Sequence, residues 1–88
     1  MYGKVFKAAR KRDNHKQEEL AFKLHINQSD ISKLENDQKE MPLSLAMKWA
    51  QLTQSQEIIA LMIVGADVSQ VLAELVNTPL NLFISFLL

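Results

Sequence analysis

A short run of polar residues carries the groups best suited to recognition chemistry. Gln28, Ser29, Ser32 and Lys33 supply an amide, two hydroxyls and an ammonium group. If residues 28–36 form a helix, these positions share its outer face. Glutamine can pair bidentately with adenine, lysine can donate to guanine O6 and N7, and serine can donate or accept. The spacing therefore predicts a face that reads base edges in the major groove of double-stranded DNA.

Such a face needs apolar residues that hold its helix from behind. Two helices that meet at roughly a right angle over a short turn need a small residue where they cross and apolar residues inside the angle. Ala21 is the small residue, and Asn27 can cap the second helix. The apolar residues at the matching positions are Leu20, Leu24, Ile26, Ile31 and Leu34. The segment is therefore expected to be a helix-turn-helix.

The segment QEELAFKLHINQSDISKLEN (residues 17–36), with its flanks from Gly3 to about Leu52, resembles the Cro/cI-type helix-turn-helix family of phage and bacterial repressors. The residues that match the family pattern are Gln17, Leu20, Ala21, Ile26, Asn27, Ile31, Ser32 and Glu35. Several residue types at fixed offsets make a specific signal. The resemblance covers well over half of the chain and implies a lambda-repressor-like DNA-binding domain.

The resemblance also implies roles for single residues. Gln17 resembles the glutamine that binds phosphate and supports the recognition helix, and Asn36 resembles an asparagine that contacts the DNA backbone. Lys16 and Lys39 are expected to support the same backbone contacts. The base-reading positions of the family fall on residues 28, 29 and 33. The residues that position the protein on the DNA backbone are thus different from the residues that read the bases.

In this family an arginine of the first helix often pairs with the glutamate that ends the recognition helix, and Arg10 and Glu35 fit that architectural role. His25 and Asp37 stand where the family usually has glycine, so the turn at His25 is expected to be kept with slight strain. Asp30 adds another acid near the reading face. Carboxylates near phosphates oppose binding, unless Asp30 accepts from cytosine N4 or caps the helix.

The whole chain is expected to be helical, because it has two glycines, two prolines and no sustained period-two alternation. A first helix is expected over Gly3–Arg12 and a fourth from about Leu43 to Thr53. Ser55 and Asp67 are expected to cap two further apolar helices, with Gly65 in a left-handed conformation between them. The expected fold class is all-α: a compact helical bundle with a helix-turn-helix and additional C-terminal apolar helices.

The C-terminal part is the second informative region. Apolar residues recur at helical spacing over residues 68–76, and the last nine residues, LNLFISFLL, contain seven apolar side chains and no charge. They could complete the monomer's core, form a two-fold dimer interface or dock a separate protein. Because a large exposed apolar patch is unusual on a small monomer, we expect burial between subunits. The expected dimer-interface residues are Val68, Val71, Leu72, Leu75, Leu82, Phe83 and Phe86.

Charge is distributed unevenly, although the chain has no net charge. In the first sixteen residues only Asp13 opposes the basic residues, which leaves a local charge of +5. These basic residues are Lys4, Lys7, Arg10, Lys11, Arg12 and Lys16. A cluster of this sign suits phosphates, although a solvated helix face would look the same.

Several classes of site are not expected. Without cysteine there are no disulfides, thiolate metal sites or cysteine nucleophiles, which agrees with a cytoplasmic location. His15 and His25 have no obvious third ligand at matching spacing, so neither a metal nor a cofactor is expected. No glycine-rich phosphate loop occurs, and we reject an enzyme. The terminal apolar run would cover only roughly 14 Å as a helix, which is too short to span a membrane.

We therefore expect residues 1–54 to be the DNA-binding region and residues 55–88 to be a dimerising extension within the same compact domain. The leading hypothesis is a small phage- or prophage-type transcriptional repressor that binds a palindromic operator as a homodimer. The alternative is a helix-turn-helix protein that acts mainly through protein contacts, as an antirepressor or an antitoxin-like partner. Relief of repression would then need dilution, proteolysis, or an antirepressor or other protein partner.

Overall fold

The computed structural model describes residues 2–65 and 67–77, with the side chains of residues 74–77 left out. This part of the chain forms helices and no strand, which confirms the all-α prediction. The helices are α1 (Gly3–Arg12), α2 (Gln17–Leu24), α3 (Gln28–Glu35), α4 (Leu43–Leu52), α5 (Gln56–Ile63) and α6 (Val68–Asn77). The bounds expected for the first and fourth helices agree with α1 and α4 to within one residue.

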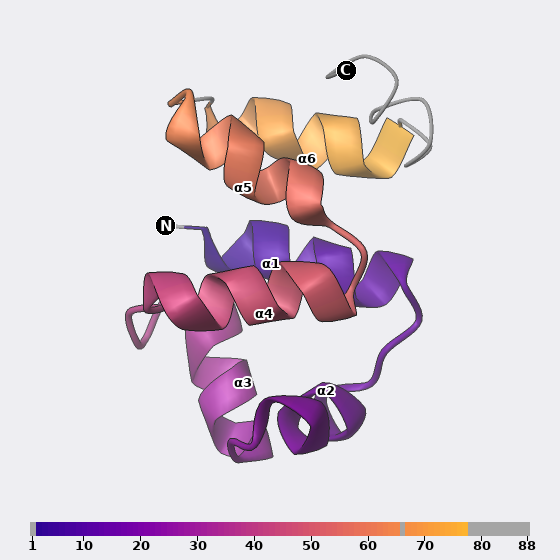
Figure 1. Ribbon diagram of the computed structural model, residues 1–88, viewed down its shortest axis with the longest axis vertical. Coiled ribbons are helices and arrows are strands. Elements are labelled where there is room, and N and C mark those ends of the chain that lie inside the picture. The colour runs from indigo at the N-terminus through magenta and orange to yellow at the C-terminus, as the bar shows by residue number, and fades with distance from the viewer. Residues whose placement is uncertain (1, 66, 78–88) are drawn as a thin grey trace.

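The helices form three layers along the longest axis of a molecule that measures 35 × 22 × 20 Å (Figure 1). At one end lie α2 and α3, in the middle α1 and α4, and at the other end α5 and α6. Among the described helices, α6 packs mainly on α1, α5 on α4, and α2 on both α3 and α4. The helix pair α2–α3 therefore stands at one end of the molecule.

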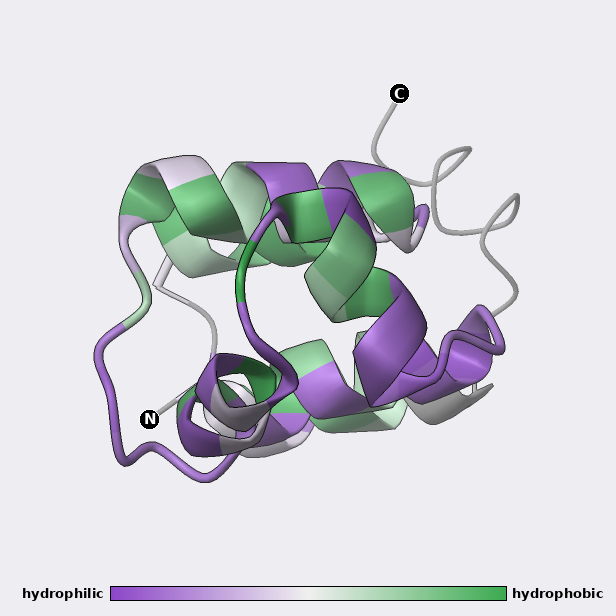
Figure 2. Cartoon of the chain, turned by 90° about the horizontal axis from the view of Figure 1, so that it is seen from below, coloured by the Kyte–Doolittle hydropathy of each residue, from purple (hydrophilic) through white to green (hydrophobic). Residues whose placement is uncertain are grey.

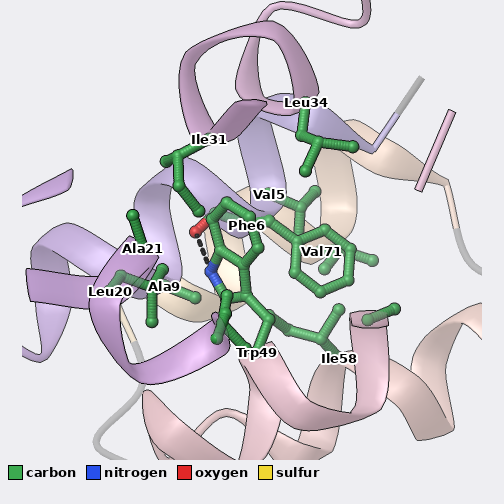
Figure 3. Close-up of a cluster of buried hydrophobic side chains, with 12 residues drawn as sticks. Val5, Phe6, Ala9, Leu20, Ala21, Ile31, Leu34, Trp49, Ile58 and Val71 are labelled. Atoms are coloured by element: carbon green, nitrogen blue, oxygen red, sulfur yellow. Dashed lines mark hydrogen bonds between the residues drawn. The ribbon is translucent and has the colours of Figure 1, made fainter. Parts of the chain in front are cut away.

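Trp49 and Phe6 form the centre of the core. Both side chains are buried, their rings meet edge to face with centroids 5.7 Å apart, and the indole Nε1 donates to the Phe6 carbonyl at 3.1 Å (Figure 3). The bond satisfies an indole N–H that would be costly to bury alone. Ile31 of α3, Ile58 of α5 and Val71 of α6 are all fully buried in the same cluster. One core therefore joins the three layers.

The position of α6 corrects one expectation from the sequence. Val71 has no exposed surface in the single chain, and Val68 and Leu72 are half-buried against the same core. The assignment of Val71 to a dimer interface is therefore wrong, because α1 of the same chain already covers this face of α6. The side chain of Leu75 and the expected interface residues Leu82, Phe83 and Phe86 lie outside the described part of the chain.

Helix starts follow the predicted capping positions, with differences in detail. Asn27, Ser55 and Asp67 each precede a helix, and Asp67 Oδ1 accepts from the Ser69 N–H at 2.8 Å. The side chains of Asn27 and Ser55 make no capping bond. Ser55 Oγ instead donates to the Thr53 carbonyl at 3.0 Å. The helix boundary was thus predictable at these positions, whereas the side-chain partner was not.

Each of the helices α1 to α5 is followed closely by a residue in the left-handed region. These residues are Asn14, His25, Asp37, Gln54 and Gly65, with φ between 52° and 77°. After α1 to α4, the next N–H donates to a carbonyl five residues back, as in a Schellman motif. The four bonds join His15 to Arg10, Ile26 to Ala21, Gln38 to Lys33 and Ser55 to Ala50. Only the last of the five positions has glycine, the residue that adopts this conformation without steric cost.

Candidate nucleic-acid interface

A tight turn fixes α3 against α2. Ala21 is 4% exposed, and its carbonyl accepts from the Ile26 N–H at 3.0 Å. His25 takes the left-handed conformation, with φ 58° and ψ 39°, as expected for the turn position at which the family has glycine. Ile31 and Leu34 of α3 are buried behind the turn. Backbone bonding and apolar packing together therefore set the direction of α3.

The opposite face of α3 carries the polar residues singled out from the sequence. Gln28, Ser29 and Lys33 are exposed, whereas Ser32 is half-buried. All four lie on one eight-residue helix, so their relative positions are fixed by its backbone. An exposed row of amide, hydroxyl and ammonium groups at the end of the molecule can meet hydrogen-bonding groups of a large ligand.

A buried ion pair anchors the end of α3 to α1. Arg10 Nε lies 2.6 Å from Glu35 Oε2, and Arg10 Nη2 lies 3.1 Å from Glu35 Oε1. The exposed fractions of the two side chains are 9% and 1%. Arg10 Nη1 also donates to the His15 carbonyl at 2.8 Å, which ties the α1–α2 connection to the pair. This bidentate geometry is the strong form of an arginine–carboxylate contact.

Hydrogen bonds connect this pair to the exposed face of α3. Gln17 Nε2 donates to Glu35 Oε1 at 3.0 Å, and Gln28 Nε2 donates to Gln17 Oε1 at 3.4 Å. Because an ionised carboxylate can only accept, the Gln17 amide must turn its nitrogen to Glu35 and its oxygen to Gln28. The Gln28 amide then turns its nitrogen inward. Its Oε1 and second N–H remain available for a ligand.

Two acids that were expected to oppose DNA have partners within the protein. Asp37 Oδ1 accepts from the Gly3 N–H at 3.0 Å, and Lys39 Nζ lies 3.3 Å from Asp30 Oδ1. The amino terminus of the chain, the Gly3 N–H and the Lys4 ammonium favour the ionised carboxylate and lower the pKa of Asp37 below its usual value. The negative charge of Asp37 thus faces the N-terminus of α1, where the helix dipole favours it.

Gly3 allows the close approach of α1 to the end of α3. A Cβ at this position would lie 2.5 Å from the Glu35 carbonyl oxygen and 2.6 Å from that of Leu34. These distances are too short for any larger side chain without a backbone shift. The glycine therefore brings the N-terminus of α1 within reach of Asp37 and holds α1 beside the recognition helix.

The basic cluster near the N-terminus is smaller than its composition suggested. Besides the buried Arg10, the Arg12 guanidinium is used internally: its Nη2 donates to Glu57 Oε1 at 2.6 Å and to Ser55 Oγ at 2.8 Å. Sequence reasoning missed this contact, because its partners lie more than forty residues away and no local pattern marks them. Lys16 remains exposed next to α2.

The residues proposed for backbone contacts lie at the two ends of the helix pair. Gln17 begins α2, and Asn36 directly follows α3. Asn36 and Lys39 are exposed on the connection from α3 to α4, which is mostly hydrophilic in the view from the α2–α3 end (Figure 2). They flank the polar face of α3 in the chain. Such flanking polar groups suit a ligand that extends beyond α3 in both directions.

The two histidines lie in different local environments. His15 Nε2 lies 2.7 Å from Asp13 Oδ2, and His25 is exposed in the turn. In the described residues no group of three or more His, Asp or Glu is placed to hold a metal ion. No described helix has the length and apolar character needed to cross a membrane.

Comparison with known proteins adds one match. A family model described as helix-turn-helix matches residues 6–57, more than half of the chain. The matched range contains most of α1, all of α2, α3 and α4, and the start of α5. No curated protein and no solved structure matches the chain.

Proposed function

Because the chain belongs to the Cro/cI-type helix-turn-helix family, a family of DNA-binding domains, we propose that it is a transcriptional repressor of phage or prophage type. In this proposal it binds a palindromic operator as a homodimer and places α3 in the major groove. The family is typically not enzymatic. The observation that carries the proposal is an exposed polar face on a helix that is fixed from behind by the buried Arg10–Glu35 pair.

The orientation of the Gln28 amide favours one base. An outward Oε1 can accept from adenine N6, while the second N–H can donate to adenine N7. Lys33, about one and a half turns further along α3, can donate to guanine O6 and N7. Ser29 and Ser32 can donate or accept beside them, with Ser32 at the less exposed position. We infer an operator half-site with adenine opposite Gln28.

Contacts to the DNA backbone would come from residues beside this face. One N–H of the Gln17 amide is used by Glu35, so the other can donate to a phosphate. Asn36, Lys16 and Lys39 extend the polar surface on either side. Lys39 would have to leave Asp30, a small cost because exposed ion pairs contribute little.

Sequence selection from random duplex DNA tests the proposal directly. We expect one enriched palindromic site with half-sites about 34 Å, or one helical turn, apart. Gln28→Ala should weaken the selected complex by roughly 1–3 kcal/mol and relax the preference at a single position. Lys33→Ala should act similarly at another position. Lys23→Ala, which removes an exposed lysine of α2 outside the proposed face, is the matched control and should retain affinity.

The same measurement distinguishes the repressor from the alternative function. If no duplex is bound even at low salt, or if the Gln28 and Lys33 variants leave a sequence-specific complex intact, the repressor proposal fails. A role through protein contacts would then be preferred. The observation in its favour is the exposure of Leu43 and Ile63, at 66% and 79%.

A further inference from the structure

An apolar groove of about 320 Å³ lies between α4 and α5, away from the reading face. Its lining includes Met47, Ala50, Ile59, Ala60 and Ile63. Although these side chains come from two packed helices, the groove opens to the surface, with Met47 46% and Ile63 79% exposed. No described residue closes it.

The helix α4 extends this apolar surface. Leu43 lies one turn before Met47 and is 66% exposed. Position i and position i+4 of a helix share a face, so these two side chains continue the line of the groove. Polar side chains would be the usual occupants of such exposed helix positions. A contiguous apolar surface of this kind marks a place where another apolar segment binds.

The chain itself supplies a segment of matching chemistry. Residues 80–88, LNLFISFLL, contain seven apolar side chains and no charge. The structure describes the chain as far as Asn77, so residues 80–88 lie beyond its described part. The run and the groove are each too apolar to remain in water without cost. Their chemistry is complementary.

We propose that residues 80–88 of one copy occupy the α4–α5 groove of a second copy, and that reciprocal exchange forms the dimer. Only Thr78 and Pro79 separate α6 from the apolar run. A connection this short favours exchange between copies over return to the same chain. Moreover, α6 packs mainly on α1, whereas the groove belongs to α4 and α5. The exchange rests on the dimer of the proposed function, but it places the contact on α4 and α5, not on the inner face of α6.

Single substitutions at each side of the contact test the exchange without DNA. Ile63→Glu places a charge in the groove at a position exposed enough to leave the fold intact, and Phe83→Asp places a charge in the apolar run. Each should raise the dimer dissociation constant roughly tenfold to a hundredfold, the range for loss of one well-buried apolar anchor. Val64→Glu is the control: Val64 is 77% exposed, adjacent in sequence and outside the groove lining. Sedimentation equilibrium of the 88-residue chains measures the masses, and circular dichroism checks folding.

A mixture of the two variants separates exchange from any other dimer. The Ile63→Glu chain keeps an intact run, and the Phe83→Asp chain keeps an intact groove. Each alone should be mainly monomeric, whereas their mixture should form a heterodimer through one remaining contact. A monomeric unsubstituted chain, an unchanged mass for Ile63→Glu, or a mixture that stays monomeric would overturn the exchange. If the protein is monomeric but still binds a half-site, the exchange fails and the proposed DNA function stands. If the exchanged dimer forms but binds no duplex, the exchange stands and the proposed DNA function fails.

Discussion

At the scale of single residues, Glu35 joins the architecture to the reading face. It accepts from Arg10 of α1 and from Gln17 of α2, and Gln17 in turn accepts from Gln28. The pairing of Arg10 and Glu35 could be anticipated, because the resemblance carries it. The resemblance also implies that Gln17 supports the recognition helix, but the partners of its amide could not be anticipated, since a sequence pattern does not specify whether the amide oxygen or the nitrogen faces a carboxylate.

Removal of Glu35 should therefore be costly. Glu35→Ala leaves the Arg10 guanidinium buried without its partner, and we expect a loss of roughly 3–5 kcal/mol in the free energy of unfolding. Urea denaturation followed by circular dichroism measures it. Lys39→Ala, which removes the exposed pair with Asp30, should cost less than about 1 kcal/mol. Similar losses for the two variants would show that burial does not control the strength of the Arg10–Glu35 pair.

The acids near α3 show where residue-level reasoning was incomplete. Asp30 and Asp37 were expected to oppose phosphates, yet Lys39 pairs with the first, and the second accepts from the N-terminus of α1. Gly3 lies 34 residues from Asp37, so only the fold reveals that contact. By contrast, exposure of Gln28 and Lys33 followed from helical spacing alone.

At the scale of helices, the boundaries were the more predictable feature. Gly3–Arg12 was expected as a helix from its apolar spacing, and Gly65 was expected in a left-handed conformation. Helical spacing also identified the apolar stripe of α6. Helical spacing could not show what covers this stripe, because packing against α1 of the same chain and packing against a second copy both require apolar residues at the same positions. Val71 was assigned to the wrong partner for this reason.

The left-handed helix ends give a prediction at this scale. Gln54 has φ 52° in an exposed turn, and a side chain with a Cβ costs about 1–2 kcal/mol in this left-handed region. Replacement by glycine removes this steric cost, but part of the gain is lost because glycine has greater conformational freedom in the unfolded chain. Gln54→Gly should therefore stabilise the protein by about 0.5–1 kcal/mol, as measured by thermal unfolding. Asn14→Gly is the control at φ 60°, and its effect should be close to zero because asparagine tolerates this region. A stabilisation by Asn14→Gly as large as that by Gln54→Gly would refute the steric explanation.

At the scale of the whole molecule, the three layers share one core. Ile31 comes from one end layer, Ile58 and Val71 come from the other, and all three join the buried cluster around Phe6 and Trp49 of the middle layer (Figure 3). The salt bridge from Arg12 to Glu57 also joins the middle layer to α5. Residues 55–77 are thus expected to fold together with the helix-turn-helix, and not as an appendage to it.

Because the three layers share one core, we expect the protein to unfold cooperatively. Val71→Ala removes two buried methyl groups and leaves a cavity, so it should lower the free energy of unfolding by roughly 2–3 kcal/mol. Calorimetry should still show one two-state transition. Val64→Ala, at an exposed position, should change stability little. A Val71→Ala protein with an early separate transition would show that α6 is an independent unit.

The burial of Trp49 gives the molecule an optical property. It is the only tryptophan of the chain, it has no exposed surface, and its indole N–H donates a hydrogen bond to the Phe6 carbonyl. Its fluorescence therefore comes from one apolar environment at the junction of the three layers and shifts to longer wavelength only when water reaches that junction. Because Trp49 lies behind α3 and not on its polar face, its emission reports loss of the fold separately from occupancy of that face by a ligand.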